Sequence, residues 1–522
     1  MKELTFEYKI IKAVCLAALI IPTIMFFLGW IKPIISIPLT LMLLGSYVFA
    51  LIKDDDRRQI KVGLNELIFI LIVVTLWCVL TGIGGVTASK ADLYWRNPIY
   101  ADIIFKEWPV RYYEEFNGYG FSYYIGYWLV PGAISKIFTF LGQDIAWNVG
   151  RIALIIWTAF LLCLCSLLLK VYTKAKGFKS TVIMMLLFVF FSDMDIISLG
   201  IQTAFNNLQE VFFVKLRHFE HLTCCWQFSS MSTQLAWAFN QSVPAWLASL
   251  LFINEKTAKS YALIGLSIMI TSPLPLVGLG ALMMTFAARD LFKSMKDGTL
   301  RSGIRQILSP TNILAAISIF PPVAMYYSSN GSGGNMELGL SYAAIHWKSY
   351  LAFMIGCHIV TTLVLLKKDH IFECVLLLCS FCIFPIIFIG QSALDIKKYP
   401  LDIATNSDFC MRATIPAIVI LMAMVARYFF GSKNKKDLRV VLLTIIMALG
   451  LLAPMAEMIS SIEGAINPER AYFYPYSRSL MTLEDMDPYL VFNTDTETNS
   501  IREESNFICI TEESNFYKYL AR

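Results

Sequence analysis

Four charged residues lie close together in one short stretch of an otherwise apolar chain. The segment "KADLYWRNPIYADIIFKEWPV", residues 90–110, contains Asp92, Arg96, Asp102 and Glu107 directly after an apolar run. A carboxylate at the rim of a membrane helix bundle could accept a proton from a sugar hydroxyl, or hold a divalent cation against a phosphate. Either role requires cationic residues elsewhere in the chain to bind the anionic partner.

The two aspartates of this stretch have different local explanations. Asn97 and the proline after it predict the start of a helix. On that helix Asp102 and Lys106 lie four residues apart and can pair, so Asp102 is expected on a solvated face. Asp92 precedes the predicted helix and is the candidate catalytic residue, with an exposed loop carboxylate or an ion-pair partner for Arg96 as the alternatives. Arg96 is in turn a candidate substrate-binding residue.

A second charged group precedes a later apolar run. In "SDFCMRATIPA", Asp408 and Arg412 lie four residues apart, and Lys398 comes shortly before them. The planar guanidinium of Arg412 could hold a lipid phosphate through two parallel hydrogen bonds. The alternative is an interfacial arginine that pairs with Asp408 and keeps its charge at the membrane surface.

Four more polar residues lie at predicted span ends. "FSDMD" places Asp193 and Asp195 near the outer end of a span, where a carboxylate is costly and functional by default. Two residues apart on a helix they cannot share a face, so Asp195, nearer the surface, is the candidate, with a helix-end carboxylate as the alternative. "FNQSVPAWL" adds Asn240 and Gln241 as substrate-binding candidates, although buried amides also hydrogen-bond helices together.

The composition indicates a membrane protein. The chain has 522 residues, of which 57% are hydrophobic and 16% charged, and its mean hydropathy is +0.61. Soluble domains are nearer one quarter charged. Apolar runs of about 20 residues recur along the chain, which predicts an all-α polytopic bundle of about 13 transmembrane helices. The net charge of +5 is mild and no basic patch indicates nucleic acid as a partner.

The distribution of Lys and Arg between the spans predicts the orientation. The loops richest in these residues fall on one side, which should be the cytoplasm, with the N-terminus inside and the C-terminus outside. The predicted spans are 13–31, 34–52, 66–86, 148–169, 181–199, 236–253, 311–328, 347–366, 371–391, 411–430 and 439–460, with a hairpin of two shorter helices, 260–272 and 277–288, broken at Ser272 to Pro275.

This layout predicts two parts, a transmembrane domain over residues 1–461 and an extracytoplasmic tail over 462–522. The first large outer loop covers residues 87–147. Its stretch 120–142 is expected to lie along the outer face as a pair of interfacial helices broken at Pro131, because a crossing there would place the basic "KVYTKAKGFK" outside. In the tail, the alternation in "NFICIT" is a weak strand signal.

The layout resembles the GT-C superfamily of membrane glycosyltransferases. The resemblance rests on the early outer-loop acid Asp92, the Trp-Pro pair in "EWPV", the stretch ending "KIFTFLG", and Arg151 in "NVGRIALII". It implies a GT-C helix bundle in a bacterial cytoplasmic membrane. It also implies transfer of sugar from a polyprenyl-phosphate donor to an envelope glycan, lipid or protein, with Asp92 as base or metal contact and Lys398 and Arg412 holding the donor phosphate. Members often carry adjacent acids in this loop, whereas Leu93 follows here, and two extra spans precede the usual first one.

Two other classes of function remain open. A transporter or flippase of lipid-linked glycans should place polar residues at the bilayer midplane, often with internal repeats. In this sequence the polar residues are expected at the outer span ends, and no repeat architecture is found. A non-catalytic protein of an envelope assembly is the third class. The sugar, the acceptor and the need for a divalent cation cannot be read from the sequence.

Overall fold

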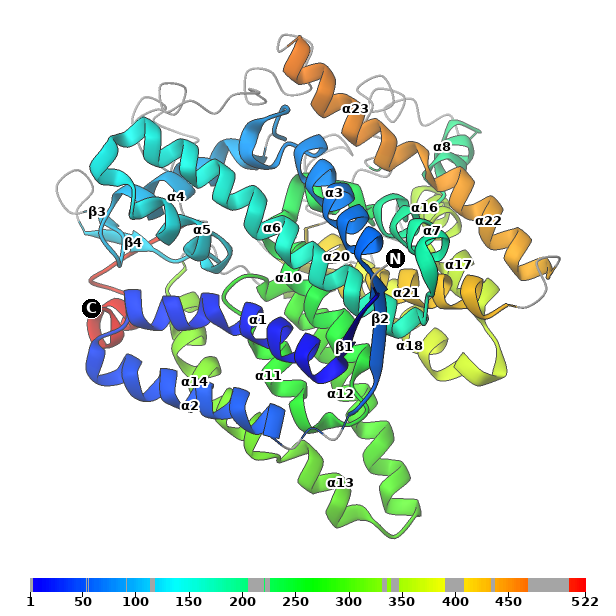
Figure 1. The fold of residues 1–522 in the computed structure, drawn as a ribbon, viewed down its shortest axis with the longest axis horizontal. Helices are drawn as coiled ribbons and strands as arrows, with labels where there is room; N and C mark the ends of the chain where they lie inside the picture. Colours follow the sequence, from blue (N-terminus) through cyan, green and yellow to red (C-terminus); the bar gives the residue numbers. More distant parts are fainter. Residues whose placement is uncertain are drawn as a thin grey trace.

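The molecule is a bundle of α-helices with short strands at its ends (Figure 1). The computed structural model describes residues 3–52, 54, 56–90, 92–112, 118–204, 220, 226–330, 336–338, 347–389, 408–432, 437–467 and 507–522. In this part of the chain, eight helices are long and apolar enough to cross a membrane, and two more apolar helices are shorter, Leu64–Leu80 and Ile415–Gly431. A helical integral membrane protein is therefore confirmed, while the number 13 and the GT-C fold stay predictions.

The elements follow the chain in this order. The helices are α1 Tyr8–Trp30, α2 Pro33–Ile52, α3 Leu64–Leu80, α4 Asp92–Phe105, α5 Gly126–Lys136, α6 Gln143–Thr173, α7 Gly177–Phe190, α8 Asp195–Ala204, α10 Met231–Asn254, α11 Tyr261–Leu266, α12 Pro273–Lys296, α13 Leu300–Ile307, α14 Pro310–Tyr327, α16 Trp347–Gly356, α17 His358–Leu365, α18 Ile371–Ile383, α20 Asp408–Ala413, α21 Ile415–Gly431, α22 Leu438–Gly450 and α23 Leu452–Ile466. Short 3₁₀ turns cover Ile83–Gly85, Thr139–Leu141, Ala258–Ser260, Lys368–His370 and Phe384–Ile386, and a π-turn covers Phe516–Leu520.

The strands form three small antiparallel sheets. They pair β1 Glu3–Glu7 with β2 Gln59–Gly63, then β3 Arg111–Tyr112 with β4 Tyr119–Phe121 and β7 Ile508–Ile510, and finally β5 Met336–Leu338 with β6 Ile387–Ile389.

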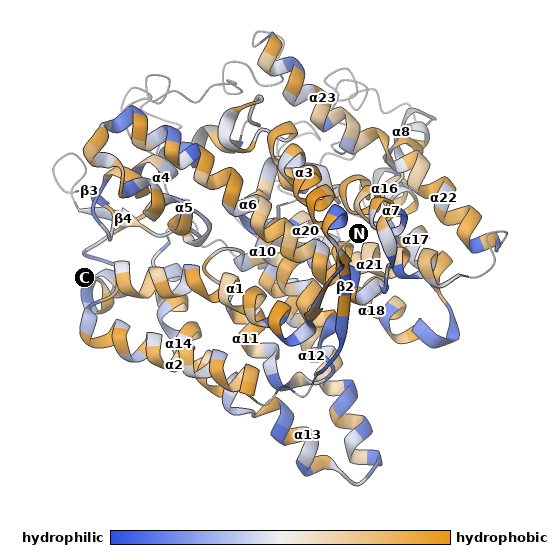
Figure 2. Ribbon diagram, in the orientation of Figure 1, coloured by the Kyte–Doolittle hydropathy of each residue, from blue (hydrophilic) through white to orange (hydrophobic). Residues whose placement is uncertain are grey.

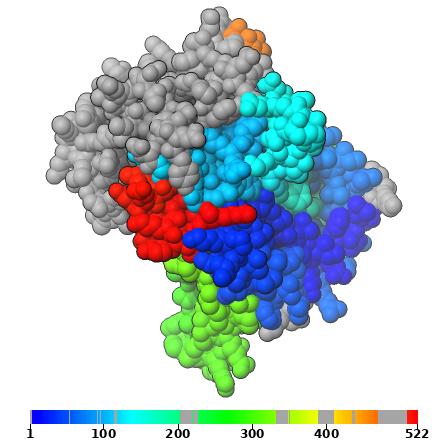
Figure 3. Space-filling view, turned by 90° about the vertical axis from the view of Figure 1, so that its left-hand side faces the viewer, coloured from blue at the N-terminus to red at the C-terminus, as the bar shows by residue number. Residues whose placement is uncertain are grey.

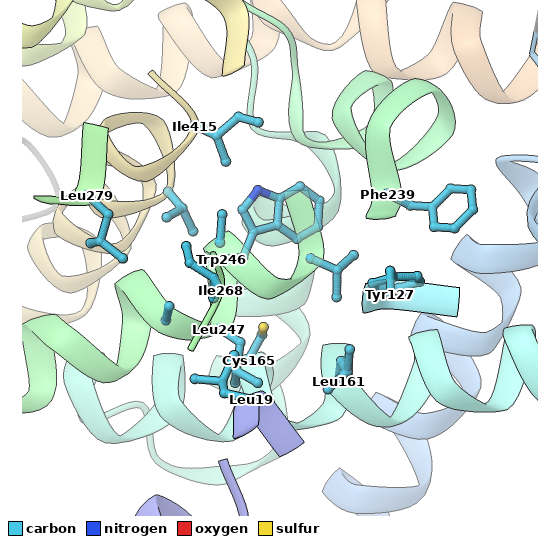
Figure 4. Packing of buried hydrophobic residues seen from close by; sticks show 14 of the residues in the cluster. Leu19, Tyr127, Leu161, Cys165, Phe239, Trp246, Leu247, Ile268, Leu279 and Ile415 are labelled. Atoms are coloured by element: carbon cyan, nitrogen blue, oxygen red, sulfur yellow. The ribbon is translucent and has the colours of Figure 1, made fainter. Parts of the chain in front are cut away.

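Two helices occupy the centre of the bundle. All but two residues of α10 are buried, its polar side chains included, and so are the first 12 of the 17 residues of α21. Trp246 of α10 stacks on Trp77 of α3 with ring centroids 5.8 Å apart, and Leu161 of α6 lies in the same core (Figure 4). In contrast α2 exposes Ile34 and Leu41, and the long helices are mostly hydrophobic (Figure 2). Such exposed apolar faces fit lipid rather than water.

The chain leaves α3 for the loop over residues 87–147, the predicted first outer loop, through a glycine turn. The third span ends at Leu80, six residues before the predicted end, because Gly82 and Gly84 adopt φ angles of +88° and +75°. Glycine reaches this left-handed region at little cost. Arg151 of α6 donates to the main-chain oxygens of Gly84 and Gly85, both at 2.8 Å. Arg151, one of the residues on which the family resemblance rests, therefore stabilises this turn through two hydrogen bonds.

Several predicted spans are interrupted. The span predicted over 181–199 ends at Phe190, and α8 begins at Asp195 after four non-helical residues. The span predicted over 347–366 is divided at Cys357 into α16 and α17. The predicted break at Ser272 is confirmed, since Pro273 opens α12.

The stretch 120–142 contains one short helix. The 11 residues of α5 extend about 16 Å, too little to cross about 30 Å of hydrocarbon. The predicted break at Pro131 is wrong, because α5 runs through it to Lys136. Gly132 explains how the helix is held: a Cβ there would lie 2.8 Å from Ile103 of α4, so the glycine permits close contact between the two helices.

The end of the chain packs on the first outer loop. The predicted strand in "NFICIT" is confirmed as β7, with Gly120 opposite Cys509. Further along, Ala521 bridges Ile31 at the end of α1, and Phe516 is fully buried. The segment 507–522 lies against the N-terminal helices and the first outer loop (Figure 3).

Candidate functional site

Asp92 lies in the first turn of α4, and the predicted helix start at Asn97 is wrong by five residues. An acidic side chain in the first turn is stabilised by the helix dipole, and an arginine four residues later adds an ion pair. The Oδ2 atom of Asp92 lies 2.8 Å from Nη2 of Arg96. The side chain of Asp92 is 41% exposed, whereas that of Arg96 is 5% exposed. Asp92 is therefore the more accessible member of a half-buried ion pair.

The buried guanidinium of Arg96 joins α4 to α10 and to the outer loop. It donates to the main-chain oxygen of Trp237 and forms a side-chain hydrogen bond with Tyr123. The indole nitrogen of Trp237 donates to Glu457 of α23 at 3.1 Å. Glu457 in turn pairs with Lys90 at 2.9 Å, and both are buried. One chain of polar contacts thus crosses from the loop to α23.

Arg412 reaches the same place from α20. Its side chain is buried, and Nη1 donates to the hydroxyl of Tyr124 at 3.0 Å. The rings of Tyr123 and Tyr124 are in contact, with centroids 3.7 Å apart. The phenol of Tyr123 lies within electrostatic reach of both Arg96 and Arg412. Asp92 and Arg412 are therefore connected indirectly, through Arg96 and the tyrosine pair.

We call this set the α4 network; it comprises Lys90, Asp92, Arg96, Tyr123, Tyr124, Trp237, Arg412 and Glu457. Its three cationic and two acidic side chains leave an excess of one positive charge before any ligand binds. Two buried guanidiniums suit a phosphate, because arginine matches phosphate geometry. The partly exposed carboxylate suits proton transfer.

The C-terminal segment holds the tyrosine pair in place. The main-chain N–H of Ser122 donates to the oxygen of Phe507 at 3.0 Å, and the ring of Phe507 contacts that of Tyr123 with centroids 4.8 Å apart. From α14, the hydroxyl of Tyr326 accepts from the main-chain N–H of Tyr123 at 3.1 Å. The two tyrosines therefore follow a strand that is fixed from both sides.

Asn240 and Gln241 lie in the interior of α10, and their predicted place at a span start is wrong. The helix begins at Met231, and a kink at Ala238, with φ −139° and ψ 31°, comes just before them. Both side chains are fully buried. Within the described residues, none of their four amide atoms has a hydrogen-bond partner. The helix-tying alternative therefore has no contact to support it in this part of the chain.

Asp195 belongs to a second acidic group, remote in sequence from the first. Because the helix ends at Phe190, Asp193 and Asp195 need not obey helical geometry, and both line one small pocket of ≈ 10 Å³ with Glu220. The expectation that the two aspartates point apart is thus wrong. Asp193 also lies 2.5 Å from Nε2 of His358, and both are buried. His358 was not predicted, although a histidine inside an apolar run is a usable signal.

Asp102 is fully buried, so its predicted solvated position is wrong. It is 3.6 Å from Nζ of Lys106, as the spacing predicts, and it also accepts a hydrogen bond from the hydroxyl of Tyr112. The helix turns this face toward the sheet of the outer loop instead of toward water. Burial raises the pKa of the Asp102 carboxyl to about 7, although the nearby Lys106 and Tyr112 oppose the rise.

The remaining predicted residues are only partly described. Lys398 lies outside the described residues, and Asp408 is the first residue of α20. Among the described residues, no group of three or more His, Cys, Asp or Glu side chains is arranged to hold a metal ion, and the divalent cation stays a prediction. Glu457 was missed, although an acid within "LLAPMAEMIS" is an intramembrane charge and a signal in its own right.

Comparisons of the chain with family models, with curated proteins and with solved structures found no match.

Proposed function

We propose that the protein is a membrane glycosyltransferase that takes sugar from a polyprenyl-phosphate donor and transfers it to an envelope acceptor outside the cytoplasm. The observation that carries the proposal is the α4 network, where a partly exposed carboxylate and two buried arginines from distant parts of the chain are linked through Tyr123 and Tyr124. A phosphate leaving group and a hydroxyl nucleophile need such a pair of functions.

The proposed step is a single displacement at the anomeric carbon. The acceptor oxygen forms a bond to that carbon, and the bond from the carbon to the phosphate oxygen breaks with both electrons going to the phosphate. Asp92 takes the hydroxyl proton, and Arg412 binds the donor phosphate and keeps holding it as it departs. Arg96 holds Asp92 at 2.8 Å and acts as a positioning residue.

Transport of a lipid-linked glycan is the second candidate, and one observation favours it. Asn240 lies nine residues into the 24-residue α10, which is about 14 Å from the helix start and close to half of a bilayer core. Buried amides without partners beside a kink are a feature of substrate sites at the membrane midplane. The polar residues are thus less confined to the outer ends than the sequence predicts.

A reconstitution assay separates the two functions. The purified full chain is placed in liposomes with synthetic polyprenyl-phosphate monosaccharides labelled in the sugar, together with envelope glycan and lipid acceptors. Transferase activity releases polyprenyl phosphate and moves the label into an acceptor or into water, whereas transport moves the intact donor to the other leaflet. The comparison is between wild type, Asp92→Asn and the matched control Asp144→Asn, whose carboxylate is exposed in the first turn of α6.

Loss of sugar release in Asp92→Asn, with Asp144→Asn equal to wild type, supports the proposal. Donor that changes leaflet without cleavage of its sugar, equally in all three proteins, assigns transport. Full sugar release by Asp92→Asn overturns the assigned base.

A further inference from the structure

A large pocket opens where α1 ends, apart from the α4 network. It has a volume of ≈ 1020 Å³, and its described lining contains four basic side chains and one acidic one, Lys106, Arg111, Lys136, Arg522 and Glu107. Lys106 already faces the buried Asp102 at 3.6 Å. Among the described residues, no Asp or Glu side chain lies at ion-pair distance from Lys136 or Arg522, and the four basic side chains of the lining outnumber its one acid, Glu107, whose charge acts on Lys136.

The contacts around the pocket hold these cations in place. Lys136 donates to the main-chain oxygens of Ile104, at 3.4 Å, and of Lys106, which fixes its ammonium against the end of α4. Arg111 donates to the main-chain oxygen of Arg522 at 2.5 Å. The main-chain N–H of Arg522 donates to the oxygen of Trp30 at 2.9 Å. Arg111, Lys136 and Arg522 thus line one pocket because the C-terminal segment is docked on the residues around it.

The opposite wall of the pocket is apolar and belongs to a membrane helix. Met25, Leu28 and Gly29 come from the last two turns of α1, one of the candidate spans. Trp108 lines the pocket and packs on Trp30 with ring centroids 5.1 Å apart. Tryptophans gather at the depth of lipid headgroups, and the end of a span reaches the same depth.

Exposed apolar side chains continue from the basic pocket onto the surface. Directly after Lys136 come Ile137, 68% exposed, and Phe140, 79% exposed, while Leu28 on the α1 side is 48% exposed. A free phosphate ion would use only the cations. An anionic lipid would place its headgroup on the cations and its acyl chains along these apolar residues, so both halves of the surface favour a lipid.

We propose that this pocket binds the phosphodiester headgroup of an ordinary anionic phospholipid of the bilayer, as a site separate from the α4 network. The proposal does not depend on the reaction proposed above. Bound lipid would join α1, the outer loop and the C-terminal segment through one shared anion. The ligand class follows from the excess of basic over acidic side chains in the lining, an aromatic wall and an apolar exit.

The test is lipid binding to the purified full chain in detergent, measured by native mass spectrometry. Phosphatidylglycerol and phosphatidylcholine with the same acyl chains are added at equal concentration. The test variant is Lys136→Gln with Arg522→Gln. The matched control is Lys179→Gln with Lys518→Gln, which removes the same charge from exposed side chains that do not line the pocket.

We expect wild type and the control to retain phosphatidylglycerol in preference to phosphatidylcholine. The test variant should bind phosphatidylglycerol roughly twentyfold more weakly, because each basic side chain near an anionic lipid contributes about fivefold. Thermal melting of each variant without added lipid reports whether the fold is intact. If the double variant melts early, the single variant Arg522→Gln replaces it. We expect that variant to bind phosphatidylglycerol about fivefold more weakly than wild type does.

Three results would overturn the proposal. The first is equal retention of the two lipids by wild type, and the second is a test variant that retains phosphatidylglycerol as wild type does. The third is full displacement of phosphatidylglycerol by millimolar inorganic phosphate, since that would assign the pocket to a free anion instead of a lipid.

Discussion

The two ends of α4 carry one aspartate each, and both aspartates have a basic residue four positions later. At the first turn, Asp92 is 41% exposed while its partner Arg96 is buried; at the last turn, Asp102 is fully buried while its partner Lys106 is 31% exposed. The same spacing thus gives opposite burial. The difference arises outside the helix, because the sheet of the outer loop covers the last turn and Trp237 covers the arginine at the first. An accessible acid can act on a ligand, whereas a buried one acts on the fold.

The largest expected effect lies at the exposed end. Asp92→Asn should slow sugar release by about a hundredfold to ten-thousandfold, the usual range for loss of a general base. The asparagine can still accept a hydrogen bond from Arg96, so the midpoint of thermal unfolding should fall little. Release measured in liposomes and melting measured in detergent separate the two. An Asp92→Asn variant with the sugar release and the stability of wild type would show that the accessible aspartate of α4 does not act on a ligand.

The next effect concerns the partner that α20 brings to the same end. Arg412→Ala should weaken the apparent affinity for the polyprenyl-phosphate donor by roughly tenfold to a hundredfold, the loss expected for about 1.5–3 kcal/mol of hydrogen bonding to a charged group. The maximal rate should change less. Arg427→Ala, an exposed arginine further along α21, is the control. A changed maximal rate together with an unchanged apparent affinity for the donor would exclude Arg412 as a donor contact.

At the buried end the expected effect is on stability. Asp102→Ala leaves the hydroxyl of Tyr112 without its carboxylate acceptor, which should lower the free energy of unfolding by about 1–3 kcal/mol. Asp102→Asn keeps an acceptor and should cost less. Melting followed by tryptophan fluorescence gives the difference, and sugar release by the folded fraction should stay close to wild type. Alanine and asparagine variants of equal stability would show that the Tyr112 contact contributes little.

The smallest effect is a pH dependence. The pKa of Asp102 is raised by burial to about 7, so between about pH 4 and pH 7 the folded protein holds a proton that the unfolded chain has released. The contribution of this group to stability is therefore greatest in acid and is lost as pH rises to 7. Wild type should melt roughly 1–3 °C higher at pH 5 than at pH 8, because the free energy of unfolding falls by about 1.4 kcal/mol for each pH unit between pH 5 and pH 7. Asp102→Asn should lack this part of the slope, and an identical slope in both proteins would contradict the assignment.

The sequence predicted the class of fold better than the details of its site. Apolar runs of span length are a property of the chain itself, so the helical membrane bundle and the break before Pro273 could be read directly. The surroundings of Asp102, Asp193 and Asn240 could not be read from the sequence, because each depends on a neighbour distant in sequence or on the residue at which a helix begins or ends. Helical spacing gave the Asp102 pair with Lys106 correctly and its exposure incorrectly.

The candidate site shows the same limit. Asp92 and Arg412 are more than 300 residues apart, and nothing in their local sequences links them. The two tyrosines that lie between them, Tyr123 and Tyr124, belong to a stretch that reads only as aromatic and interfacial. Buried ionisable residues such as Glu457 and His358 could have been found, since an ionisable residue in an apolar run is conspicuous by its solvation cost.

The pairing of β7 with β4 has a consequence for the timing of biosynthesis. Cys509 contacts the main-chain oxygen of Gly120 across 389 positions of sequence. At a synthesis rate of about 5–20 residues per second, the edge of β4 waits roughly 20 to 80 s for its partner after it leaves the ribosome. During that interval the membrane helices between them must insert while the outer loop has an open strand edge, a position from which strands pair wrongly. β7 can therefore pair with β4 only after all the helices between the two strands have been synthesised.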